Sequence, residues 1–329
     1  MKELQKLIIS DFYTKSGKAI EIQLSYQTFG KPLHTAPIVL VNHALTGNSN
    51  VTGINGWWDV IIGEDKPIDT NVFSVLAFNI PGNGFSGQKE EVAKYYREFT
   101  AQDIAQLFLQ GIELLKIDNL FAVIGGSVGG GITWHMSFLK PKLIQHTIPV
   151  ASNWKATDWL VANCFIQERI LENSQDPIAD ARMHAMTFYR TPESLKEKFE
   201  GTLANDNSGR YNVETWLDYH GKKLSNRFQL SAYKMMNQIL KTINVANTEK
   251  DFLNIANNIK GSIHIVCVNS DLLFDPNQDK KTFLALKTIK NNVTISEIES
   301  IHGHDAFLIE YQQLKKILHP IFQSEIKKK

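Results

Sequence analysis

Short apolar runs that end in glycine or turn residues recur along the first half of the chain. They are PIVLVNHALTG (37–47), VFSVLAFNIPG (72–82) and LFAVIGGSVGG (120–130). Runs of this kind are typical of strands buried on both faces of a parallel sheet. Residues 20–30 instead alternate apolar with polar side chains and carry β-branched and aromatic residues. This alternation predicts a half-exposed strand and an antiparallel start to the sheet.

Helical spacing of apolar residues separates these runs. The segment 100–117 places Thr100 where it can cap a helix, with Asp103 three positions on as an acidic partner for the first turn. Strands that alternate with helices predict an α/β fold with a mostly parallel central sheet.

The alternation stops after residues 148–152 and resumes at 262–270. Between them the chain shows helical periodicity without convincing strands, and Thr191 followed by Pro192 predicts a helix start. We therefore predict a helical lid inserted between two strands of one α/β domain. The expected boundaries are residues 1–152 for the first part of the core, 153–245 for the lid and 246–329 for the second part of the core.

Composition narrows the classes of function. The 329 residues include 35 Lys and Arg against 34 Asp and Glu, a formal charge of +1. There is no basic excess to neutralise a nucleic acid backbone or an anionic membrane. No apolar stretch is long enough for a membrane span, and polar residues interrupt the N-terminal segment where a signal peptide needs an apolar core. We expect a cytoplasmic enzyme without nucleic acid or membrane partners.

The two cysteines, Cys164 and Cys267, lie 103 positions apart, without a neighbouring cysteine or histidine in a metal-ligand spacing. They predict buried thiols, with neither a metal site nor a disulfide framework.

Candidate chemistry begins with Gly125, Ser127 and Gly129, a G-x-S-x-G pattern directly after a predicted buried strand. In a nucleophile elbow the serine occupies a strained strand-to-helix turn that admits only small neighbours. Helix-compatible residues follow, and no phosphate-loop pattern competes for this segment. Ser127 is therefore the predicted nucleophile.

A serine nucleophile needs a base and an acid that orients the base, and in this kind of fold both follow it in the chain. Asp271 comes after the strand predicted at 262–270, and His304 comes after the strand predicted at 291–299. Asp275 is the alternative acid and His302 the alternative base. Asp271 and His304 lie where strand ends meet loops, the edge at which open α/β sheets assemble their sites, so they are the predicted acid and base. Asp275 lies further from its strand end.

An oxyanion hole requires two backbone amides. We expect one from Val128, the residue after the nucleophile, and one from Leu45 in the loop that follows an earlier strand. Asn42 and His43 in the same loop are interpreted as residues that stabilise the turn.

Seven segments together resemble the homoserine O-acetyltransferase family of the α/β-hydrolase superfamily. They are NHALTGNS, GWWDVIIGEDKPIDTNVF, VIGGSVGG, ARMHAMTFYRTPESLKEKF, YNVETWLDYHGKKLSNRF, NSDLLF and GHDAFLIE. The resemblance, which runs from about residue 20 to 312, implies acetyl-CoA and L-homoserine as substrates in methionine biosynthesis. It also implies an acetyl-serine intermediate, no cofactor beyond acetyl-CoA as co-substrate, and a homodimer formed through the lid.

The same resemblance assigns site residues. The family's nucleophile, acid and base match Ser127, Asp271 and His304. Its acceptor-binding arginine, tyrosine and aspartate match Arg182, Tyr189 and Asp305. A guanidinium suits the homoserine carboxylate, and a carboxylate suits the homoserine ammonium.

The chain departs from the family in the loop NIPGNGFSG (79–87), which resembles general α/β-hydrolases, and in a shorter lid segment between residues 173 and 181. Four alternatives stay open. They are a hydrolase acting on a small ester or thioester, a homoserine O-succinyltransferase, an enzyme that transfers the acyl group to another hydroxyl, and a binding protein without catalysis.

Overall fold

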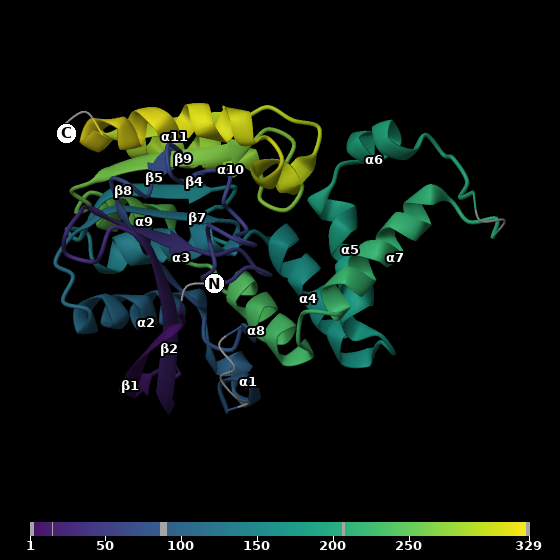
Figure 1. Ribbon diagram of the computed structural model, residues 1–329, viewed down its shortest axis with the longest axis horizontal. Helices are drawn as coiled ribbons and strands as arrows, with labels where there is room; N and C mark the ends of the chain where they lie inside the picture. The colour runs from purple at the N-terminus through teal and green to yellow at the C-terminus, as the bar shows by residue number, and fades with distance from the viewer. Residues whose placement is uncertain (1–2, 15, 86–90, 206–207, 327–329) are drawn as a thin grey trace.

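The computed structural model describes residues 3–14, 16–85, 91–205 and 208–326. Its main feature is an eight-stranded sheet in the order β1-β2-β6-β3-β7-β8-β9-β10 (Figure 1). The strands are β1 (Gln5–Tyr13), β2 (Ala19–Gly30), β3 (Ile38–Asn42), β6 (Ser74–Phe78), β7 (Leu120–Gly126), β8 (Ile144–Val150), β9 (Ser262–Val268) and β10 (Val293–Ile298). Two short strands, β4 (Ile62–Gly63) and β5 (Ile68–Asp69), pair separately.

The sheet begins antiparallel and continues parallel. Strand β2 pairs antiparallel with β1 and β6, and every later pair from β6 to β10 is parallel. This confirms the predicted antiparallel start and mostly parallel sheet. Strand β1 was not predicted, because most of its side chains are exposed and its apolar residues do not alternate.

Helices cover both faces of the sheet. On one face, α2 (Ala101–Leu114) and α3 (Val128–Leu139) pack on alternate side chains of the central strands such as Leu40 and Leu76. On the other face, α11 (Tyr311–Ile326) packs on the intervening residues such as Val39 and Val75 (Figure 1). Two-sided burial is why these strands are continuous apolar runs. The remaining core helices are α1 (Glu91–Lys94), α9 (Glu249–Ala256) and α10 (Pro276–Lys287), with the 3-10 turns η1 (Tyr96–Glu98) and η2 (Gly303–Leu308).

Both predicted helix starts are confirmed. Thr100 accepts the amide N–H of Asp103, whose carboxylate accepts the amide N–H of Thr100 at 2.7 Å, so the two residues form a capping box at the start of α2. Thr191 accepts the amide N–H of Ser194 at 3.0 Å ahead of Pro192.

The helical insertion lies between β8 and β9. It consists of α4 (Asp158–Asn173), α5 (Pro177–Tyr189), α6 (Pro192–Phe199), α7 (Asn212–Ser225) and α8 (Leu230–Lys241). Helices α4 to α7 project to one side of the core, and α8 lies next to it (Figure 1). On α8, Met235 packs against Gly82 and Ala232 against Gly84, so this helix joins the insertion to the loop after β6.

The loop 79–87 named in the sequence analysis is described only as far as residue 85, and its residues 86–87 lie outside the described residues. Within the described part of the chain, none of the helices combines the length and apolar character needed to cross a membrane.

Candidate active site

Ser127 occupies the turn between β7 and α3 with φ of +58°, in the left-handed region that non-glycine residues seldom adopt. Small neighbours make the turn possible. A Cβ added to Gly125 would lie 2.3 Å from the carbonyl oxygen of Gly129, and one added to Gly129 would lie 2.3 Å from that of Asn42. The chain therefore folds here into the strained strand-to-helix turn expected from the G-x-S-x-G pattern.

Three side chains from separate loops meet at this turn. The Nε2 of His304 lies 2.9 Å from Oγ of Ser127, and its Nδ1 lies 2.7 Å from Oδ2 of Asp271. The other oxygen of Asp271 accepts the amide N–H groups of Leu273 and Phe274, at 2.7 and 2.9 Å. These bonds orient the carboxylate, which fixes the imidazole with one nitrogen facing the serine.

The two alternative residues lie elsewhere in the structure. Asp275 caps α10 and accepts the amide N–H of Asn277 at 2.9 Å. The Nδ1 of His302 lies 2.9 Å from Oγ of Ser194 on α6. Hydrogen-bond geometry thus brings Asp271 and His304, rather than their alternatives, to Ser127.

The expected oxyanion loop packs on the first turn of α3. Close contact of Gly129 with the backbone of Asn42 and His43 brings the loop after β3 against the helix N-terminus that carries Val128. First-turn amides of a helix have no intrahelical acceptor, so Val128 can offer its N–H to a ligand. Leu45 is buried three residues beyond Asn42. Both expected donors therefore belong to segments that adjoin Ser127.

His43 fixes this loop rather than taking part in proton transfer. Its Nδ1 bonds the carbonyl oxygen of Ala44 at 2.8 Å, and its Nε2 accepts the amide N–H of Ile80 at 3.0 Å. Full burial lowers the pKa of His43 to about 4, so the ring is neutral near pH 7 and accepts through Nε2. This agrees with its interpretation as a turn-stabilising residue.

A buried polar network extends this anchor, and no sequence pattern had indicated it. Asn79 bonds the hydroxyls of Ser25 and Ser49 at 3.0 and 2.9 Å, and its carbonyl oxygen accepts the amide N–H of Ser49 at 2.8 Å. Asn83 bonds both Asn79 and His43. The network ties the loop after β3 to the loop after β6.

The residues expected to bind an acceptor also come together. The guanidinium of Arg182 lies 5.4 Å from the centre of the Tyr189 ring, and that ring lies 5.5 Å from the ring of His304. Asp305 follows His304 directly. Burial raises the pKa of Asp305, and the nearby charge of Arg182 opposes the shift. The site adjoining Ser127 therefore contains a cation, a phenol and a carboxyl group.

Sequence reasoning missed Arg190. Its Nη1 lies 3.9 Å from Oδ2 of Asp305, and its side chain is only 13% exposed. In the sequence, Arg190 has the appearance of a solvated residue at the end of a helix, and no local motif indicates a role in the site.

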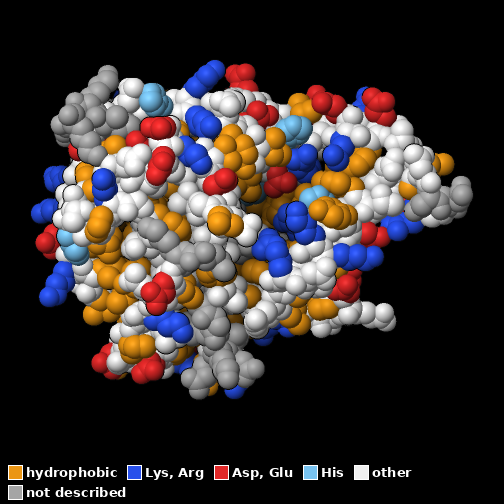
Figure 2. Space-filling model, in the orientation of Figure 1, with side chains coloured by type: hydrophobic (Ala, Val, Ile, Leu, Met, Phe, Trp, Pro, Cys, Tyr) orange, Lys and Arg blue, Asp and Glu red, His pale blue; other side chains and the backbone are white. Residues whose placement is uncertain are grey.

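Further basic side chains of the insertion surround this group. Burial lowers the pKa of His220 to about 4, and the charges of Arg182, Lys223 and Arg190 reinforce the shift. Burial and the charge of Arg182 also lower the pKa of Arg227. Figure 2 shows Lys and Arg side chains gathered around the hollow between the core and the insertion. Such a field attracts anionic ligands.

A small cavity lies beside the catalytic group. Its lining includes Leu45 of the oxyanion loop, Tyr189, and Leu273 of the acid loop, with Cys164 from α4. Both cysteines are buried, and burial raises the thiol pKa of Cys164 to about 12, so it is protonated near pH 7.

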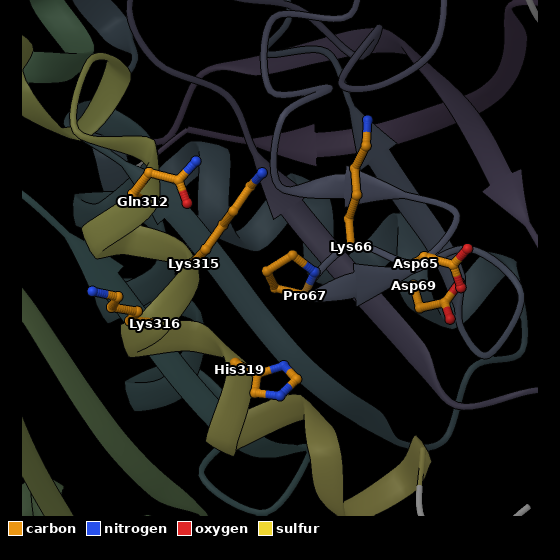
Figure 3. Close-up of a pocket in the computed structure, with 8 residues that line it drawn as sticks. All are labelled: Asp65, Lys66, Pro67, Asp69, Gln312, Lys315, Lys316 and His319. Atoms are coloured by element: carbon orange, nitrogen blue, oxygen red, sulfur yellow. The ribbon is translucent and has the colours of Figure 1, made fainter.

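A larger cavity of about 440 Å³ lies away from this group, between the β4–β5 segment and α11. Figure 3 shows Lys66 and Lys315 beside it, and none of its lining residues belongs to the serine site. Among the described residues, no three His, Cys, Asp or Glu side chains are grouped so that they could hold a metal ion.

Comparison with known proteins identifies the family of this chain. A family model described as the alpha/beta hydrolase fold matches residues 37–302. A homoserine O-acetyltransferase of Methanococcus vannielii is 31% identical over 96% of this chain and 72% of its own length. This chain belongs to the homoserine O-acetyltransferase family. Another homoserine O-acetyltransferase, from Nautilia profundicola, is 26% identical and aligns over 95% of this chain and 96% of its own length.

Solved structures share the fold of this family member. A homoserine O-acetyltransferase from Bacillus anthracis has a TM-score of 0.84 at 18% identity, and the match covers 97% of both chains. Esterase E22 has the same TM-score and identity, over 97% of this chain and 99% of the esterase. The α/β-hydrolase fold, which here has a helical insertion between β8 and β9, is thus confirmed, and it is shared by transferases and esterases.

Proposed function

We propose that this chain is a homoserine O-acetyltransferase that acts in methionine biosynthesis. It would transfer the acetyl group of acetyl-CoA to the hydroxyl of L-homoserine and release O-acetyl-L-homoserine and CoA. The observation that carries the proposal is the continuous hydrogen-bonded series Ser127, His304, Asp271, in a chain related over 96% of its length to a homoserine O-acetyltransferase.

In the first half-reaction, Nε2 of His304 takes the proton of the Ser127 hydroxyl as Oγ attacks the thioester carbonyl carbon. The amides of Val128 and Leu45 would stabilise the oxyanion of the tetrahedral intermediate. When the intermediate collapses, the C–S bond breaks, and His304 returns its proton to the leaving sulfur of CoA. The product is acetyl-Ser127.

In the second half-reaction, His304 removes the proton of the homoserine hydroxyl, whose oxygen attacks the acetyl-serine carbonyl carbon. Collapse breaks the bond to Oγ of Ser127, which regains a proton from His304. Asp271 keeps the imidazole in one tautomer and stabilises its protonated form in both halves.

Transfer requires an acceptor that is held in place, because water competes for the acyl-enzyme at much higher concentration. The proposal assigns the acceptor carboxylate to Arg182 and the acceptor ammonium to Asp305, with the Tyr189 ring between Arg182 and His304. The basic residues around the hollow support binding of an acceptor that carries a carboxylate.

The remaining expectations belong to the same proposal. No cofactor would be needed beyond acetyl-CoA as co-substrate, and the cytoplasm would be the site of action. Residues 153–245 would act as a lid. Trp159, Phe165 and Ile166 on α4 are 57%, 54% and 44% exposed. An exposed apolar face of this kind supports a homodimer formed through the lid.

A hydrolase acting on small esters is the second candidate. Two observations favour it, namely the equal structural similarity to esterase E22 and the loop 79–87, which resembles general hydrolases. The hydrolase would use the same three side chains, with water in place of homoserine.

The test is product analysis by mass spectrometry. Purified protein is incubated with acetyl-CoA and L-homoserine, and in parallel with succinyl-CoA and L-homoserine. We expect O-acetyl-L-homoserine in amounts that match CoA release. Acetate as the main product would overturn the proposal in favour of the hydrolase, and faster formation of O-succinyl-L-homoserine would overturn the assignment of the donor.

A further inference from the structure

The junction between α5 and α6 lies along the loop that carries the catalytic histidine. Thr191 donates its hydroxyl hydrogen bond to the carbonyl oxygen of Ile301. Three residues further, Oγ of Ser194 bonds Nδ1 of His302 at 2.9 Å. Two side chains of the lid therefore hold the two residues that directly precede Gly303.

Gly303 makes the contact closer still. Its φ is +67°, and an added Cβ would lie 2.8 Å from the carbonyl oxygen of Tyr189 and 3.3 Å from the amide nitrogen of Thr191. Because glycine allows this approach, the backbone on either side of Arg190 packs directly on the histidine loop. The relative positions of Arg190 and Asp305 are thus fixed by the fold.

Arg190 is the charged side chain at the centre of this contact. Its guanidinium Nη1 lies 3.9 Å from Oδ2 of Asp305, with side-chain exposures of 13% and 20%. Within the described part of the chain, the buried Nε of Arg190 has no hydrogen-bond partner. Keeping a guanidinium buried with an unused donor costs free energy, so its position calls for a reason other than stability.

We propose that Arg190 is a positioning residue for the acceptor, whose guanidinium orients the Asp305 carboxylate so that Asp305 can receive the acceptor's ammonium. The inference rests on the proposed function. Arg190 does not itself touch the acceptor in this account, which distinguishes its role from that of Arg182. The junction between α5 and α6 would thereby hold the acceptor site and the loop of His304 in a fixed relative position.

Charge around Asp305 gives the proposal a second consequence. Burial raises the pKa of the Asp305 carboxyl, and the charge of Asp271 raises it further. The charges of Arg182, His304 and Arg190 lower the same pKa. Loss of the Arg190 charge should therefore raise the pKa of Asp305 further. Since only the ionised carboxylate attracts an ammonium, acceptor binding should then weaken at a higher pH than in the parent protein.

A double-mutant cycle tests the proposal in the full-length protein. Arg190→Gln is made alone and together with Asp305→Asn, and the KM for L-homoserine is measured from CoA release. We expect Arg190→Gln to raise KM about tenfold with less than a threefold change in kcat, and Arg190→Lys to recover part of the loss. In the Asp305→Asn background, Arg190→Gln should change KM less than twofold.

Two further readouts separate positioning from a structural role. The acidic limb of kcat/KM for homoserine should move to higher pH in Arg190→Gln, and CoA release by the donor alone should be unchanged. Arg169→Gln, which removes an exposed cation of α4, is the matched control and should match the parent protein.

An equal Arg190→Gln penalty with and without Asp305 would overturn the proposal and indicate a direct contact with the acceptor or a structural role. If Arg190→Gln does not fold, Arg190→Lys carries the same cycle. Absence of homoserine-dependent CoA release in the parent protein would overturn the proposed function and this inference with it.

Discussion

The Nδ1 of His304 lies 2.7 Å from Oδ2 of Asp271. Oδ1 of the same carboxylate is held by two backbone N–H groups of the loop after β9. A carboxylate fixed in this way can hold the imidazole in a single tautomer. Asp275, only four residues further along the chain, instead caps α10.

This difference predicts opposite effects for the two aspartates. Asp271→Asn should lower kcat by about 10³- to 10⁴-fold with little loss of stability, because the amide permits the wrong histidine tautomer. Asp275→Ala should lower the free energy of unfolding by about 1 kcal/mol through loss of the helix cap and leave kcat within a fewfold of the parent. Steady-state kinetics and urea denaturation measure the two effects. The reverse pattern would exchange the roles of the two residues.

Arg182 provides a test of the acceptor site. Arg182→Lys keeps the positive charge but loses the planar, bidentate hydrogen-bonding geometry that matches a carboxylate. The value of kcat/KM for homoserine should therefore fall, by an amount that corresponds to about 1.5 to 3 kcal/mol of transition-state free energy. Acylation by acetyl-CoA alone should change little. Rapid-quench measurement of each half-reaction checks this, and equal losses in both halves would show that Arg182 faces the donor or supports the fold.

The buried histidine in the oxyanion loop predicts a pH dependence of stability. The pKa of His43 is about 4 in the folded chain and about 6.5 in an unfolded chain, so the unfolded state binds more protons between these values. This contribution to stability is fully present above pH 6.5 and is lost as the pH falls to 4. It amounts to about 3 kcal/mol.

Urea denaturation from pH 7 to pH 4 measures this loss. The lowered pKa values of His264 and His220, each about 4, act in the same direction. His43→Gln is therefore the control, and it should flatten the pH dependence without abolishing it. An unchanged slope in His43→Gln would mean that His43 titrates normally in the folded chain.

Much of the fold could be predicted because its strands are buried on both faces. Continuous apolar runs such as 38–42 and the strand-to-helix turn at Ser127 are local features of the sequence. Strand β1 was not predicted, because it is a mostly exposed edge strand. It forms by pairing with β2, and its own sequence pattern does not show that pairing.

The candidate site could be predicted only in part for a similar reason. The G-x-S-x-G pattern, chain order and placement at strand ends indicated Ser127, Asp271 and His304, and the structure brings these three side chains together. The role proposed for Arg190 depends on the packing of the α5–α6 junction on the loop of His304, which is a contact between segments far apart in the chain. Sequence periodicity carries no record of such a contact.

The central claim is that an acyl-enzyme at Ser127 is discharged by homoserine rather than by water. Stopped-flow measurement of CoA release tests it most directly, with Ser127→Ala as the control that should give no burst. With acetyl-CoA alone, we predict a burst of about one CoA per active site followed by slow turnover, and steady release that accelerates when L-homoserine is added. Release that is equally fast without homoserine would contradict the account.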